Sequence, residues 1–169
     1  FLANSGDLTD LSLTSTQAGD TNVYSLSATN LTFTVTDAGT SYALTNVSDT
    51  TGLNFSFSGD EGITVNTVGA GAGNVSLAST AGSILDDEAA ASTTVITGGV
   101  VTLTAATGVG AAGTAHVDTT ATSLDVSVTG AGLINLAETN GVTLTAVDTF
   151  NGAITITAGG AITVTNVTA

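Results

Sequence analysis

The feature that most constrains this chain is a short motif repeated near its C-terminal end, at residues 141–145, 151–157 and 159–166. Each copy has a small or turn residue followed by apolar, Thr, apolar and Thr. This strict alternation is typical of a β-strand that has one apolar face and one hydroxyl face. No single copy can bury its apolar face, so we expect the copies to stack as in repeat proteins.

Alternating strands of this kind recur along the whole chain in two interleaved series. The first series comprises residues 11–13, 31–35, 53–57, 75–77, 101–103, 124–128, 142–144 and 162–164. The second comprises residues 23–26, 44–47, 63–65, 84–85, 109, 134–136 and 154–156. Members of a series recur every ~20–22 residues, which predicts one all-β domain over residues 1–169, a parallel β-solenoid (β-helix) of about eight coils.

Some parts of the chain follow this repeat less closely. Residues 1–60 are irregular and richer in aromatics, and we expect them to form variant or capping coils. Residues 86–120 are also irregular, and we expect a protruding loop there. A β-sandwich is the alternative fold, because it too consists of short alternating strands separated by frequent turns.

The chain contains 14 acidic residues and no Lys or Arg, so its formal charge is −14. Binding of nucleic acid or of an anionic membrane surface relies on Lys and Arg, so both are excluded as partners. No apolar stretch approaches the ~20 residues of a membrane span, so we expect no membrane insertion. Divalent cations and neutral or cationic surfaces remain as partner classes.

Several motifs between residues 73 and 169 carry a resemblance to a known family. They are Asn-Val-Ser-Leu-Ala at 74–78, Gly-Ser-Ile-Leu-Asp-Asp at 82–87, Val-Thr-Leu-Thr-Ala-Ala-Thr-Gly-Val-Gly at 101–110 and the C-terminal Gly-Ala-Ile-Thr copies. This part of the chain resembles the repeats of filamentous-haemagglutinin-like bacterial surface proteins. The resemblance implies a right-handed parallel β-helix that is secreted to the bacterial cell surface. Members serve as adhesins, fibrous scaffolds or exotoxin stalks, and the implied partners are host or surface glycans and proteins.

The acidic residues Asp60, Glu61, Asp86, Asp87 and Glu88 form two groups about one coil apart. If the two groups stacked on one edge, their charges would repel, and Ca²⁺ with oxygen ligands would relieve the repulsion. The chain has neither an EF-hand loop nor a calcium-binding nonapeptide array. A solvated acidic loop is therefore the default interpretation, and calcium is the one cofactor that the sequence leaves open.

Paired threonines are expected to point outward from several strands. They are Thr102, Thr104, Thr143, Thr145, Thr155, Thr157, Thr163 and Thr165. A flat stack of such pairs resembles the ice-binding face of some β-solenoid antifreeze proteins, so ice or glycan binding is one hypothesis. The other is that threonine is simply a favourable polar residue in strands.

Nothing in the sequence favours catalysis. His116 is the only histidine, and it follows Gly113-Thr114-Ala115 in an expected loop, where Ser, Thr and Asp118 are neighbours by composition alone. Polysaccharide-cleaving enzymes with β-helix folds use cations to hold acidic sugars, and this chain has no Lys or Arg. We therefore expect a protein that is not an enzyme.

The leading hypothesis is an extracellular structural or adhesive module of a bacterial surface protein. A second hypothesis is a self-assembling subunit of an extracellular filament, because the open end of a solenoid exposes unpaired backbone groups. The expected polymerisation edge is Ile162, Thr163, Val164 and Thr165, which are strand-like and carry no blunting Lys or Pro. Copies would then join end to end in a non-closing contact.

Overall fold

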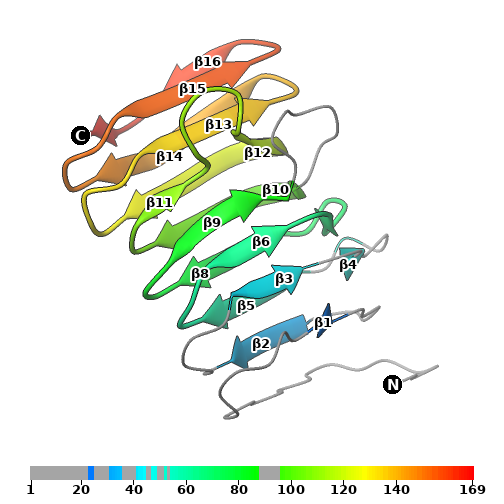
Figure 1. The fold of residues 1–169 in the computed structure, drawn as a ribbon. Coiled ribbons are helices and arrows are strands. Elements are labelled where there is room, and N and C mark those ends of the chain that lie inside the picture. Colours follow the sequence, from blue (N-terminus) through cyan, green and yellow to red (C-terminus); the bar gives the residue numbers. More distant parts are fainter. Residues whose placement is uncertain are drawn as a thin grey trace.

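The structure is a computed structural model that describes residues 23–24, 31–35, 41–44, 47–48, 52, 54–87 and 96–169. Its strands lie one above another along the length of the molecule (Figure 1). They are β1 (Val23–Tyr24), β2 (Leu31–Val35), β3 (Tyr42–Leu44), β4 (Val47–Ser48), β5 (Phe55–Gly59), β6 (Ile63–Val65), β7 (Val68–Gly69), β8 (Val75–Ser79), β9 (Ser83–Asp86), β10 (Ile96–Ala105), β11 (Gly108–Val109), β12 (Val117–Val128), β13 (Ile134–Glu138), β14 (Val142–Thr149), β15 (Ile154–Ala158), β16 (Ile162–Val164) and β17 (Val167–Thr168).

All strand pairings given by the described residues are parallel, and the 17 strands belong to one continuous sheet. The sheet winds into a parallel β-solenoid. The predicted fold class is therefore confirmed. The β-sandwich alternative is wrong, because a sandwich is built from antiparallel strands.

The two predicted series of strands are two faces of the solenoid. Face A consists of β2, β5, β8, the second half of β10, the second half of β12, β14, β16 and β17. Face B consists of β1, β3, β6, β9, β11, β13 and β15. A short third face, formed by β4, β7 and the first halves of β10 and β12, joins B to A in the middle of the stack.

The core consists mainly of aliphatic side chains, together with the aromatic Tyr42, Phe55 and Phe57, which stack in register between coils. On face B, Ile63, Ile84, Val109 and Ile134 form one such column, and each is fully buried. Burying one side chain of this size contributes about 1.5–3 kcal/mol. Because each inward residue lies on the inward residue of the next coil, the apolar interior continues through the stack.

Glycines at one corner allow the chain to pass very close to the neighbouring coil. A Cβ atom at Gly152 would lie 1.9 Å from the carbonyl oxygen of Gly132, and one at Gly132 would lie 1.9 Å from that of Thr107. No side chain fits at such a distance, so the corner requires glycine in both coils. Glycine at this corner is thus required for a steric reason.

Face A and face B each stack seven levels of strands among the described residues, compared with the eight predicted coils, and the coils differ in length. Residues 110–116 leave the sheet between β11 and β12, whereas residues 88–95, within the expected irregular segment, lie outside the described residues. The strand predicted at residues 11–13 and most of the expected capping region lie outside the described residues. The described strands up to residue 60, β1–β5, belong to the same parallel stack as the rest.

Candidate functional site

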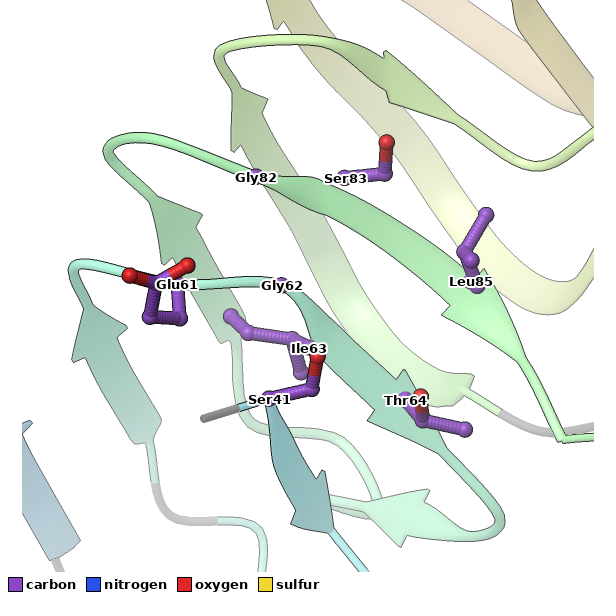
Figure 2. A pocket seen from close by; sticks show the side chains of 8 residues that line it. All are labelled: Ser41, Glu61, Gly62, Ile63, Thr64, Gly82, Ser83 and Leu85. Atoms are coloured by element: carbon purple, nitrogen blue, oxygen red, sulfur yellow. The ribbon is translucent and has the colours of Figure 1, made fainter. Parts of the chain in front are cut away.

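The predicted acidic groups lie at opposite ends of face B. Asp60 and Glu61 precede β6, whereas Asp86 ends β9 and pairs in register with Val65, the last residue of β6. Figure 2 shows Glu61 at the turn before β6, far from Leu85 near the end of β9. The expected stacking of the two groups on one edge is therefore wrong, because the register aligns Ile84 rather than Asp86 with the start of β6.

Two of these carboxylates are instead bound by neutral side chains of neighbouring coils. The Tyr42 hydroxyl donates to Asp60, and the Asn66 amide donates to Asp87 at 2.7 Å. No group of three or more acidic or histidine residues in the described part of the chain is arranged to hold a metal ion. Glu88 lies outside the described residues, so calcium binding stays a prediction.

The outward threonines do not form one array. Thr102 pairs with Ser76 and Asp125 on face A, and Thr104 pairs there with Ala78 and Ser127. Thr155 and Thr157 lie on face B, next to Asn135 and Ala137.

Near the C-terminal end, Thr143 and Thr163 are direct neighbours. Thr145 occupies a bulge of β14, and its hydroxyl donates to the Leu124 carbonyl at 3.0 Å. Thr165 follows β16, and its backbone N–H donates to the Leu144 carbonyl at 2.8 Å. The single flat threonine rank that the ice-binding hypothesis requires is therefore not formed.

The loop of residues 110–116 folds back over face B. Asn135, an outward residue of β13, donates from its side-chain amide to the carbonyls of Ala111 and Gly113 at 2.6 and 3.1 Å. At the end of the loop, His116 Nε2 lies 3.5 Å from Asp118 Oδ1. Sequence reasoning missed Asn135, because an outward asparagine in a strand gives no signal that a distant loop will cover it.

The described surface of face B includes two hollows with polar side chains in their lining. One, of about 300 Å³, is shown in Figure 2 and is lined by Ser41, Glu61, Gly62, Ile63, Thr64, Gly82, Ser83 and Leu85. The other, of about 350 Å³, is lined by Ala112, Gly113, Leu133, Ile134, Asn135, Ala153 and Thr155. Their polar groups are hydroxyls, an amide and one carboxylate. No histidine lines either hollow, so neither contains a hydroxyl nucleophile paired with a histidine base.

Glu138 is a buried acid that the sequence analysis did not single out. Its carboxylate accepts hydrogen bonds from the Thr119 hydroxyl at 2.7 Å, the Ala121 N–H at 3.1 Å and the Asn140 N–H at 3.2 Å. The alternation of β13 gives a signal for this position, because Ile134, Leu136 and Glu138 share the inward face.

The last described coil contains exposed apolar side chains. Val164 is 58% exposed, whereas Leu144, its neighbour in the preceding coil, is 4% exposed. Ile162 and Val167 are likewise exposed, and they lie on the buried residues Val142 and Val147. Ile162 to Thr165 are thus exposed in this structure, and their role as a polymerisation edge stays a prediction.

Comparisons of the chain with protein-family models, with curated proteins and with solved structures found no match. The resemblance to filamentous-haemagglutinin-like repeats therefore stays a prediction. Within the described ranges, no helix has the length and apolar character needed to cross a membrane.

Proposed function

We propose that this chain is a structural and adhesive β-solenoid module of a bacterial surface protein, without catalytic activity. The observation that carries the proposal is the parallel stack itself, in which strands of successive coils pair in register along face A and face B. Aliphatic columns fill the interior, and hydroxyl, amide and carboxylate groups face outward. Such a stack is suited to hold surfaces at a distance and to present many similar outward positions.

The outward surface favours a neutral or cationic partner. The chain carries a charge of −14 with no Lys or Arg, so it repels other polyanions and its adhesive contacts rely on hydroxyls and carboxylates. The hollows on face B offer serine, threonine and asparagine side chains of this kind. A surface glycan or a protein is therefore the proposed class of partner.

A coil deletion tests the structural part of the proposal. Residues 134–153 span one repeat of 20 residues, because Ile134 pairs with Ile154. Removing them should keep the fold and shorten the stack by ~4.8 Å, since coils contact only their neighbours. Removing residues 134–143 instead shifts the remaining strands by half a coil and should abolish folding. Circular dichroism and small-angle scattering distinguish the two variants, and equal loss of structure in both contradicts the modular role.

The adhesive part is tested on surfaces. Beads coated with the chain should adhere to plates that carry neutral glycans or surface proteins, and beads coated with an unrelated protein of similar negative charge should not. Equal adherence of both types of bead contradicts an adhesive role and leaves the structural role in place.

A further inference from the structure

We propose that the hollow beside the loop of residues 110–116 binds one neutral sugar unit of a glycan. This inference rests on the proposed adhesive role and names a site and a ligand class for it. The loop hollow is the second hollow on face B, of about 350 Å³, and it is lined by the loop and by residues at the starts of β13 and β15. That volume lies at the lower end of the range for small-molecule sites.

The loop that forms one wall of the loop hollow is held in place. Figure 1 shows it arching out of the stack between β11 and β12. Asn135 is 7% exposed, and its side-chain amide donates to the carbonyls of Ala111 and Gly113. The Ala111 N–H also donates to the Ala115 carbonyl at 2.6 Å, which closes the loop on itself. A site whose wall is already fixed avoids the entropic cost of ordering a loop when a ligand binds.

Two adjacent side chains provide the hydrogen-bonding groups of the loop hollow. Asn135 and Thr155 are neighbours in register on β13 and β15, and both line the hollow. Because the Asn135 amide N–H groups are directed to the loop, the group that remains for a ligand is its side-chain carbonyl, an acceptor. The hydroxyl of Thr155, an exposed residue, can both donate and accept. An acceptor beside a hydroxyl suits a ligand that carries hydroxyls on neighbouring carbons.

The rest of the lining is apolar, and no described residue that lines the loop hollow is charged. Ala112, Leu133 and Ala153 provide aliphatic contacts. The chain carries a charge of −14, which disfavours an anion, and a cation finds no carboxylate in this lining, in contrast to the hollow that Glu61 lines. A neutral sugar ring has C–H groups for the apolar contacts and hydroxyls for the two polar side chains. The lining therefore favours it over an amino sugar or a uronic acid.

The loop hollow faces outward from the stack. Ile154 and Ile156 of β15 pack against the core, whereas Thr155 between them is exposed. A strand paired with the other side of β15 would lie beside it, about 4.8 Å away, and would extend face B without covering its outward side. The site is therefore compatible with a longer stack.

Titration of the isotope-labelled full chain with sugars, followed by NMR of the backbone amides, tests the proposal. Glucose, galactose and N-acetylglucosamine are the neutral probes, and glucosamine and glucuronate present a similar ring with a charge. At least one neutral sugar should shift the amide signals of residues 112–113, 133–135 and 153–155. We expect a Kd in the millimolar range, because a single ring makes few contacts, and weaker binding of both charged sugars.

Two variants and a control locate the site. Thr155→Ala removes one hydrogen bond to the sugar and should raise the Kd about two- to tenfold. Ala112→Phe changes an exposed loop residue so that its ring occupies the loop hollow, and it should abolish binding. Thr157→Ala is the matched control, because it removes an exposed threonine of the same strand that does not line the hollow, and it should bind as the unchanged chain does. Circular dichroism verifies that each variant is folded.

The proposal is overturned if no neutral sugar shifts these amide signals, if the charged sugars bind as tightly, or if Ala112→Phe binds as the unchanged chain does. Adherence of coated beads is a separate readout. Adherence to glycans without shifts at the loop hollow would overturn this site and keep the adhesive role. Shifts at the loop hollow without adherence would keep the site and contradict the adhesive role.

Discussion

Replacing Glu138 should expose how a buried carboxylate holds one corner of the solenoid. Residues 139–141 join β13, which ends at Glu138, to β14, which begins at Val142. This turn lies beside the middle of β12, where the Thr139 N–H donates to the Thr119 carbonyl. The carboxylate reaches across this corner and accepts hydrogen bonds from Thr119, Ala121 and Asn140. The carboxylate thereby provides an acceptor for the backbone N–H of Ala121, which is buried in the neighbouring coil.

The expected loss in the free energy of unfolding follows from the hydrogen-bond donors that Glu138→Ala would leave without an acceptor. Hydrogen bonds to a charged group contribute about 1.5–3 kcal/mol each, and an unsatisfied buried donor costs about 1–3 kcal/mol. Thr119 and Ala121 are buried, whereas Asn140 is exposed and can bond to water. Removing the carboxylate also removes the cost of burying its charge. We therefore expect a net loss of about 2–4 kcal/mol in the free energy of unfolding.

Two further variants isolate this effect. Glu138→Gln keeps one carbonyl acceptor and replaces the other oxygen with a donor, so it should lose about half as much. Asp125→Ala removes the same charge from an outward position of β12, and it should change the free energy of unfolding by less than ~0.5 kcal/mol. Equilibrium denaturation in urea measures all three. The reasoning is refuted if Glu138→Ala is as stable as Asp125→Ala.

Three other perturbations test the described geometry. Gly152→Ala places a Cβ atom against the Gly132 carbonyl, so it should lower the free energy of unfolding, measured by thermal unfolding, by at least ~1–3 kcal/mol. Gly69→Ala is the control and should be tolerated, because the nearest atom to its Cβ would be 4.0 Å away. Asn135→Ala removes both anchors of the loop of residues 110–116, so elastase should cleave that loop roughly tenfold faster, with Thr155→Ala unchanged as control. Millimolar Ca²⁺ should leave the melting temperature unchanged, because the predicted acidic groups lie apart, and a rise of several degrees would contradict this geometry.

The parallel stack itself was predictable from the sequence. Val75, Val101 and Leu124 recur every 23–26 residues and pair in register on face A. On face B, the residues that recur every 21–25 positions and pair in register are Ile63, Ile84, Val109 and Ile134. Alternation and repeat length are local properties, because each strand shows its own apolar side and each coil repeats the last.

The contacts between coils were decided only by the tertiary structure. The lengths of the turns determine which residues of neighbouring coils meet, so a shift of a few residues separates Asp86 from Glu61 and aligns it with Val65. The same dependence explains why Glu138 meets Ala121, 17 residues away, and why Asn135 meets a loop. The sequence by itself determined that the strands stack and which side of each is buried. Register and loop path, which depend on the packing of whole coils, determined which polar groups come together.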